Sequence, residues 1–153
     1  DIYSILAPDE KAKGLPYRKE NPLHRLYYHD IASPEKIVPA LKKLSDWIDD
    51  PASKQLHPIE RIATMHARFM AVFPWAKESG RTARVASNLL LIEAGYPTAV
   101  IHSIDRQRYY ESLRGEASGL LSLYLEAVQT SAETELRLYE EAEKAPPRKR
   151  KRA

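Results

Sequence analysis

The sequence predicts an all-α domain with one small β-hairpin near its N-terminus. Two observations predict the helices: apolar residues recur at three- and four-residue spacing after residue 33, and cap residues mark where these segments begin and end. One observation predicts the hairpin: LHRLYYHDI, residues 23–31, is the only strand-like run in a proline-rich, polar start. The length of 153 residues and the hydrophobic fraction of 43% suit a single domain with one core.

The first two expected helices are amphipathic. Residues 33–50, SPEKIVPALKKLSDWIDD, open with a serine–proline cap signal, end before Pro51, and carry on one face Ile37, Leu41, Leu44 and Ile48. Residues 57–73, HPIERIATMHARFMAVF, have a proline in the first turn and carry on one face Ile59, Ile62, His66, Phe69 and Phe73.

The third expected helix covers residues 80–95, GRTARVASNLLLIEAG, and ends at Gly95 as its C-terminal cap. It is apolar nearly all round from Val85 to Ala94, so we expect it to lie buried at the centre of the bundle. Residues 103–115, SIDRQRYYESLRG, form the fourth helix with Ser103 as its cap, and residues 118–145 form a long fifth.

The charge is unevenly distributed. Lys and Arg number 24 against 21 Asp and Glu, and most of the excess lies in PPRKRKRA at the end of the chain. We therefore expect an N-terminal segment (1–13), a nearly neutral domain (14–145) that is not shaped to wrap nucleic acid, and a disordered basic tail (146–153). The tail suits a nuclear signal, a nucleic-acid arm, a linker or a solvated end equally well.

Other classes of protein are disfavoured by what the sequence lacks. The chain has no cysteine, which excludes a disulfide framework and a cysteine metal site. No apolar run approaches the roughly 20 residues of a membrane span, and the start is too charged for a signal peptide, so we expect a cytoplasmic protein without a membrane partner.

The stretch FPWAKESGRTAR, residues 73–84, carries the chemistry. A helix is expected to start at Ser79–Gly80, with Arg81 and Arg84 one turn apart and Lys77 just before it. Cations at a helix N-terminus oppose the helix dipole unless an anion lies there, held by free backbone N–H groups and guanidinium groups. The alternative is that these arginines pair with Glu60, Glu78 or Glu93.

The same stretch carries a family resemblance. It falls in the frame of the motif H-P-F-x-[D/E]-G-N-G-R-x-x-R, and the chain resembles Fic-domain proteins, which move AMP or related groups from nucleotides onto protein hydroxyls. The flanking runs HPIERIATMHARFMAVFP, RVASNLLLIEAGYP and DRQRYYESL agree as well. The resemblance extends from Gly14 to Val128. It implies a Fic-type helical bundle around a buried motif helix, with a target-docking flap that includes Leu26, Tyr27 and Tyr28.

The motif departs from the family at its reactive positions. Phe73 stands where the family has the histidine that takes the proton from the target hydroxyl, and it cannot accept a proton. Lys77 stands where an acidic residue binds Mg²⁺, and Glu78 replaces a glycine. The binding half of the motif is kept, since Gly80 and both arginines remain and Ser79 is a small polar replacement for asparagine.

We therefore expect a degenerate Fic-fold protein with an anion pocket formed by Lys77, Ser79, Gly80, Arg81 and Arg84. It would bind ATP, another nucleotide, a phosphorylated molecule or a partner protein. The nucleotide or phosphorylated ligand would bind without Mg²⁺ and without any other metal. The resemblance makes Tyr109 and Tyr110 candidates for the adenine side, one facing the core and the other the pocket wall. Ser131 and Glu135 only half-match the family's inhibitory helix.

Two alternatives stay open. The first is an active Fic-type transferase with a relocated base, for which His66 and Glu78 are the nearby candidates. The second is an adaptor whose tail contacts nucleic acid. His57, His66 and His102 lack the spacing of metal ligands, and we expect His66 to be a buried, hydrogen-bonded residue; His24 and His29 are expected to be exposed on the hairpin.

Overall fold

The computed structural model describes residues 2–14, 16–22, 29–115 and 117–144, and these residues form helices and loops without a strand. The helical elements are α1 (Ile2–Leu6), α2 (Pro8–Ala12), the 3-10 turn η1 (Pro34–Lys36), α4 (Ile37–Asp49), α5 (Pro51–Lys54), α6 (Pro58–Val72), α7 (Ser79–Glu93), the 3-10 turn η2 (Ser103–Asp105), α8 (Arg106–Arg114) and α9 (Ala117–Lys144). The predicted all-α class is confirmed. None of the described helices combines the length and apolar character that a membrane crossing requires.

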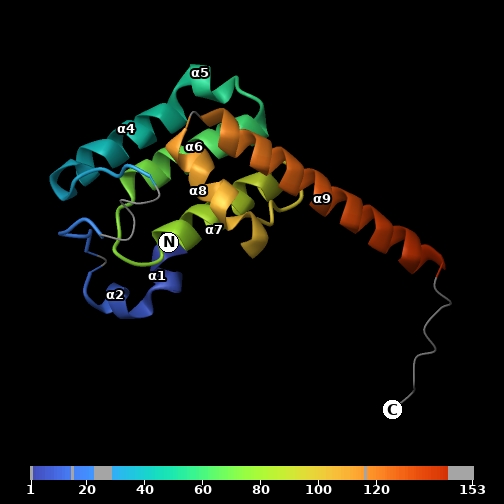
Figure 1. Ribbon diagram of the computed structural model, residues 1–153, viewed down its shortest axis with the longest axis horizontal. Helices are drawn as coiled ribbons and strands as arrows, with labels where there is room; N and C mark the ends of the chain where they lie inside the picture. The colour runs from blue at the N-terminus through green and yellow to red at the C-terminus, as the bar shows by residue number, and fades with distance from the viewer. Residues whose placement is uncertain (1, 15, 23–28, 116, 145–153) are drawn as a thin grey trace, which may run out of the picture.

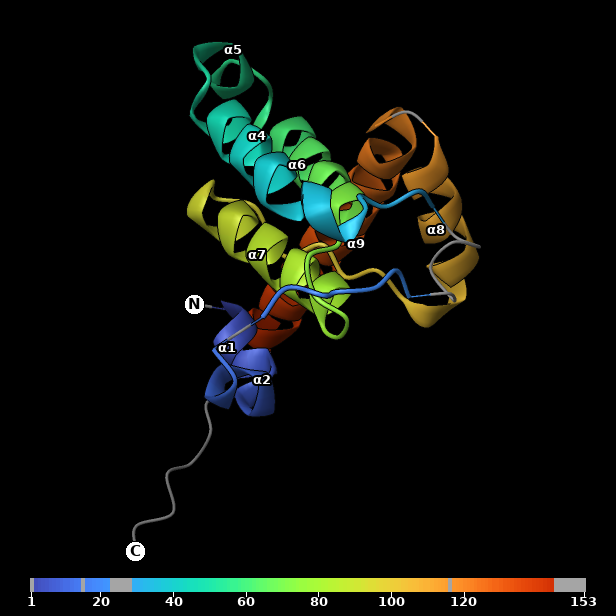
Figure 2. The same cartoon turned by 90° about the vertical axis from the view of Figure 1, so that its left-hand side faces the viewer.

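Helix α6 lies at the centre of the bundle, in contact with α4, α7, α8 and α9 (Figures 1 and 2). Its start follows the sequence signals, because Pro58 occupies the first turn and the His57 side chain accepts a hydrogen bond from the N–H of Ile59. The main core joins α6 to α7, α8 and α9 through buried residues that include Ile62, Ala63, Leu91, Tyr109, Leu120 and Tyr124.

The prediction that the motif helix α7 is buried at the centre is wrong. Val85, Leu89, Leu90 and Ile92 are 38–56% exposed. The buried face of α7 is instead made of mostly small residues, namely Ser79, Thr82, Ala83, Ser87 and Leu91. Small side chains allow two helix backbones to approach closely, so the tight contact with α6 uses this face and leaves the large leucines outside.

The predicted β-hairpin is not supported. Leu26, Tyr27, Tyr28 and His24 lie outside the described residues, so their docking role stays untested. His29, predicted to be exposed, is 4% exposed and donates from Nε2 to the carbonyl of Met70 at 3.0 Å. The histidine is buried because it supplies a donor to the C-terminal end of α6, where helix carbonyls lack intrahelical partners.

The N-terminal end of the described chain packs on the body, whereas the C-terminal end projects from it. Tyr3 of α1 is buried, and its ring stacks on Trp75 with centroids 3.8 Å apart, so residues before the predicted domain start at 14 pack on the motif loop. Helix α9 packs on α6 and α8 as far as Val128, and beyond that its side chains are almost all exposed. Figure 1 shows this second half extending away from the body. The predicted basic tail, 146–153, lies outside the described residues.

Candidate functional site

The motif loop is held between two residues in the left-handed conformation. Phe73 ends α6 with φ 46°, and Glu78 precedes α7 with φ 61°. The Ser79 hydroxyl closes the loop, since Oγ donates to the carbonyl of Trp75 at 2.9 Å and accepts from its N–H at 3.0 Å. Ser79 is fully buried, so this predicted ligand-binding residue shapes the loop from within.

Arg18 anchors the loop and was missed by the sequence analysis. Its Nε donates to the carbonyl of Phe73 at 2.7 Å, its Nη2 donates to the carbonyls of Val72 (3.2 Å) and Ala32, and its backbone N–H donates to Pro74 O at 3.0 Å. Arg18 is 5% exposed and forms no ion pair with the described residues. Burial lowers its pKa, and the carbonyls at the negative end of α6 compensate its charge.

The N-terminus of α7 has no side-chain cap among the described residues. The N–H groups of its first turn, which have no acceptor within the helix, therefore gain none from a capping side chain. The guanidinium of Arg84 lies beside Gly80, because a Cβ placed on that glycine would be 3.4 Å from Nη1 of Arg84. Arg84 is half-buried and forms no hydrogen bond or ion pair with any described residue. The geometry therefore brings together an unpaired cation and free amides at one helix end.

The other predicted anion ligands are less well placed. Arg81 donates from Nη1 to Glu78 Oε2 at 3.0 Å, so the alternative of glutamate pairing holds for this arginine. Lys77 is exposed and lines a small hollow of about 200 Å³ with Tyr3 and Arg18, and Arg84 does not contribute to that hollow. The predicted five-residue pocket is thus reduced, in this arrangement, to the amides beside Gly80 and the Arg84 side chain.

His66 is the centre of a buried polar network. Its Nδ1 lies 2.7 Å from the Tyr124 hydroxyl and 3.1 Å from Ser87 Oγ, and its Nε2 lies 2.9 Å from the Tyr109 hydroxyl. The ring is 0% exposed, as expected for a buried, hydrogen-bonded histidine. Burial, with a smaller contribution from Arg84, lowers the pKa of His66 to about 3. Because the ring is enclosed in the core, this structure gives no support to His66 as a replacement base, and that role stays a prediction.

The two tyrosines of α8 face in different directions. Tyr109 is buried in the His66 network, whereas Tyr110 lines an open surface pocket of about 480 Å³ together with Arg106 and Arg114. The Arg106 guanidinium lies 5.8 Å from the centre of the Tyr110 ring. Tyr109 faces the core, as expected for one of the two tyrosines. The pocket that Tyr110 lines includes none of the predicted anion ligands, so the role of Tyr110 on an adenine side stays a prediction.

The described residues contain no cluster of three or more histidine or acidic side chains suited to a metal ion. Glu78, the residue immediately before α7, is engaged by Arg81. Lys77 brings a positive charge to the position next to it in the loop. This set of side chains does not fit Mg²⁺, which needs oxygen ligands in octahedral geometry.

Comparison with known proteins agrees with the family resemblance of the motif. A model of the Fic/DOC family matches residues 1–91, which is more than half of the chain. The chain belongs to the Fic/DOC family. Protein adenylyltransferase fic-1 from Caenorhabditis elegans is 33% identical over 107 residues, 70% of this chain and 21% of the relative. Protein adenylyltransferase Fic from Nematostella vectensis is 31% identical over 111 residues, 72% of this chain and 26% of the relative.

Solved Fic structures agree with the fold. A Fic-1 structure from C. elegans matches with a TM-score of 0.56 and 32% identity, covering 74% of this chain and 34% of that one. A Fic domain-containing signaling protein from Bacteroides thetaiotaomicron matches with a TM-score of 0.51 and 32% identity, covering 65% of this chain and 42% of that one. The chain therefore spans about a fifth to a quarter of the length of the curated relatives named above.

The Fic motif explains the backbone of the loop. Glu78 takes the place of the first motif glycine and keeps a φ of 61°, which glycine adopts freely and other residues adopt at a cost of about 1–2 kcal/mol. The left-handed backbone at this position is therefore one that a glycine would adopt without strain.

Proposed function

We propose that this chain is a degenerate Fic-family module that binds a phosphate-bearing ligand, such as a nucleotide, at the N-terminus of α7 without transferring a group from it. The proposal keeps the ligand class of the family and drops the reaction. The observation that carries it is the contrast between Phe73 and Arg84, since the first cannot react and the second is free to bind.

The reactive position supports the loss of transfer. The Phe73 side chain is 2% exposed and packs with Met70 and Ala83 in a small apolar cluster. It has no proton acceptor, and loss of a general base typically lowers the rate about 10²–10⁴-fold. The alternative of a relocated base has little support, because His66 is enclosed in the core and Glu78 is held by Arg81.

The binding position supports retention of an anion. A half-buried arginine with no partner among the described residues would lower the stability of the fold unless something compensates its charge. An anion beside Gly80 would accept hydrogen bonds from the first-turn amides and from Arg84 together. Since the nearby side chains do not fit a metal, we expect this binding to be independent of Mg²⁺.

Calorimetry with ATP, ADP and pyrophosphate, each with and without Mg²⁺, tests the proposal. Arg84→Ala should weaken binding about ten- to a hundred-fold, because a charge-assisted hydrogen bond is worth about 1.5–3 kcal/mol. Arg81→Ala should weaken it less, since Arg81 already pairs with Glu78. Lys43→Ala is a matched control, because it removes the same charge from an exposed position on α4.

Two outcomes would contradict the proposal. If none of the three anions binds at about millimolar concentration, where the binding free energy is only about 4 kcal/mol, the site is vestigial. If the Lys43→Ala control loses as much affinity as Arg84→Ala, the anions bind through general charge and not at α7.

A further inference from the structure

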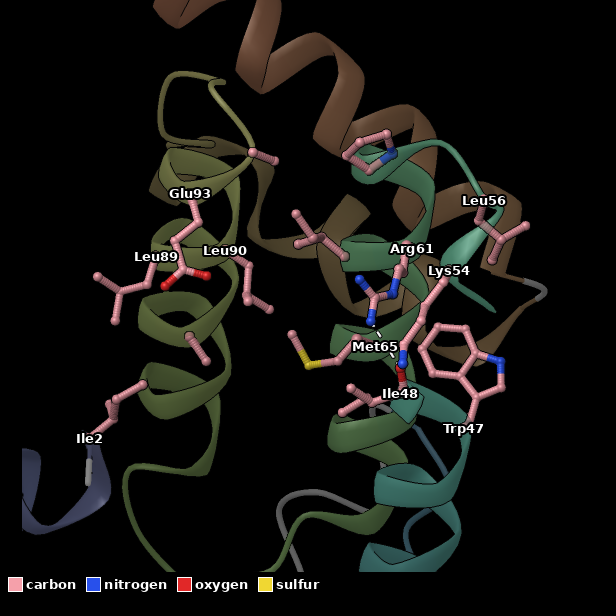
Figure 3. Close-up of a pocket in the computed structure, with 14 residues that line it drawn as sticks. Ile2, Trp47, Ile48, Lys54, Leu56, Arg61, Met65, Leu89, Leu90 and Glu93 are labelled. Atoms are coloured by element: carbon pink, nitrogen blue, oxygen red, sulfur yellow. Dashed lines mark hydrogen bonds between the residues drawn. The ribbon is translucent and has the colours of Figure 1, made fainter. Parts of the chain in front are cut away.

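An apolar groove runs between α7 and the α4–α6 side of the bundle, at the opposite end of α7 from the anion site. Its volume is about 650 Å³, and its apolar lining includes Trp47, Ile48, Met65, Leu90 and Ala94. Figure 3 shows Leu90 and Met65 pointing into the gap from the two facing helices. This groove includes part of the exposed leucine face of α7 that the sequence predicted to be buried.

The rim of the groove carries more positive than negative charge. Lys54 and Arg61 lie on the α4–α6 side near Trp47, and Glu93 lies on the α7 side (Figure 3). Arg61 donates one hydrogen bond to the carbonyl of Ile48 at 2.9 Å, and neither cation forms an ion pair with a described residue. An apolar partner with acidic flanks would therefore suit the groove better than a neutral one.

The projecting half of α9 has these properties. Residues 129–144 form a free helical arm, in which Leu136 is 60% and Tyr139 71% exposed. At 100° per residue, Ala132, Leu136 and Tyr139 fall on one stripe, and glutamates flank it. The arm carries five glutamates against one arginine and one lysine, a net charge of −3. Nearly all side chains along this arm are exposed, so its apolar stripe stays in water unless a partner covers it.

The dimensions of the arm and groove also agree. The α7 wall of the groove extends from Ala86 to Ala94, about 12 Å at 1.5 Å per residue, and the stripe from Ala132 to Tyr139 extends about 10 Å. The arm cannot reach the groove of its own chain, because α9 is one continuous helix that leads away from the body (Figure 1). A second copy of the chain has no such restriction.

We propose that two copies of this chain form a reciprocal dimer, in which the α9 arm of each copy lies in the α4–α6–α7 groove of the other. Leu136 and Tyr139 enter the apolar lining, and the flanking glutamates meet Lys54 and Arg61. When the same two copies exchange arms, the contact closes with two-fold symmetry, whereas arms donated to successive copies would propagate into a filament.

Sedimentation velocity across a concentration series of the full chain tests this dimer. The double substitution Leu136→Ser/Tyr139→Ser in the arm, and Leu90→Glu in the groove, should each raise the dimer dissociation constant at least about tenfold. Both sites are solvent-accessible, so circular dichroism should show unchanged folding. Matched controls are Leu138→Ser, exposed on another face of the arm, and Val38→Glu, exposed on α4 outside the groove.

Mixing the two variants identifies the contact. The groove variant keeps an intact arm and the arm variant keeps an intact groove, so an equimolar mixture should recover a heterodimer through one contact, with an affinity between those of the native chain and either variant alone. A fluorescein-labelled peptide of residues 129–144 should likewise bind the arm variant and not Leu90→Glu.

Three results would overturn the proposal. One is a native chain that stays monomeric at the highest concentrations while the peptide fails to bind. Another is a dimer that Leu90→Glu leaves intact, which would mean that arms pair with arms. The third is an equal loss of dimer in Leu138→Ser or Val38→Glu, which would mean that association follows general surface apolarity.

Discussion

Replacing Glu78 by glycine should tighten anion binding at the start of α7 and leave the stability of the fold nearly unchanged. Glu78 brings a negative charge to the site, holds Arg81 in an ion pair at 3.0 Å, and adopts a left-handed backbone conformation. Glycine removes the charge, releases Arg81 and fits the backbone. These three effects can be separated with two variants.

The effect of Glu78→Gly on the free energy of unfolding is the difference between one favourable and two unfavourable contributions of similar size. Relief of the left-handed conformation favours the folded state by about 1–2 kcal/mol. Loss of the Glu78–Arg81 pair, which is partly exposed, removes about 0.2–1 kcal/mol, and the extra freedom of glycine in the unfolded chain removes about 0.4–1 kcal/mol. We therefore expect a change in the free energy of unfolding of less than about 1 kcal/mol.

The effect of Glu78→Gly on anion binding should be favourable, because the substitution removes a negative charge beside the anion. Two like charges about 6 Å apart repel by roughly 3 kcal/mol at the effective dielectric constant of about 20 found near a protein surface, and screening by salt lowers this to roughly 1–2 kcal/mol. Removing the carboxylate should thus lower the dissociation constant for pyrophosphate about tenfold, and Arg81 becomes free to add a further hydrogen bond. The gain should shrink with added salt, because the site is partly exposed.

Calorimetry on the native chain, Glu78→Gly and Glu78→Gln, paired with urea unfolding, measures both quantities. Glutamine removes the charge and keeps the backbone strain, so Glu78→Gln should gain affinity nearly as much and gain no stability from the backbone. If neither variant binds pyrophosphate more tightly than the native chain at low salt, Glu78 does not face the anion and the assignment of the site is wrong.

Three further predictions concern the loop, the core and the chemistry. Arg18→Met should lower the free energy of unfolding, measured in urea, by about 2–4 kcal/mol, because the carbonyls of Val72 and Phe73 lose their donor. The control Lys19→Met changes an exposed neighbour and should have little effect. Equal losses in the two variants would refute the anchoring role of Arg18. The free energy of unfolding should fall as pH drops from about 6.5 towards 3, by up to about 1.4 kcal/mol per pH unit. The cause is that the unfolded chain protonates His66 in this range, while the pKa of His66 in the native chain is about 3. If His66→Gln leaves the pH dependence of the unfolding free energy unchanged, His66 is not its cause. Incubation of the native chain with labelled ATP, Mg²⁺ and cell lysate should label no protein. Phe73→His should not restore transfer of the labelled group, since Lys77 and Glu78 remain. Labelling by the native chain that disappears in Arg81→Ala would disprove the loss of activity.

The longer helices α4, α6, α7, α8 and α9 could be predicted because their signals are local, whereas α1, α2 and α5 are too short to show a periodic apolar pattern and were not predicted. Pro58 marks the start of α6, and the third helix was placed within about two residues of α7 (Ser79–Glu93), the usual margin for a helix end. The exposure of Leu89 and Leu90 could not be predicted, since it depends on which face of α7 packs against α6. Periodicity cannot rank faces in a helix that is apolar nearly all round.

The candidate site was predicted only in part for the same reason. The motif frame located Gly80 and Arg84, which lie together in the structure. The pairing of Arg81 with Glu78 was one of three alternatives, and only geometry distinguishes them. Arg18 carried no sequence signal, because its bonds to the motif loop go to backbone carbonyls 54 and 55 residues away, and every residue type has a backbone carbonyl.

This long-range anchoring has a consequence for the order of folding. Donors from residues 18–32 reach the carbonyls of Met70, Ala71, Val72, Phe73 and Pro74. Helices α6 and α7 can form from local contacts, but the turn between them gains its partners only after a chain closure of more than 50 residues. Such closures are entropically slow compared with helix formation. We therefore expect the motif loop to be among the last parts of this domain to acquire native geometry. It should also be the first to lose that geometry when Arg18, His29 and Ala32 detach from the end of α6.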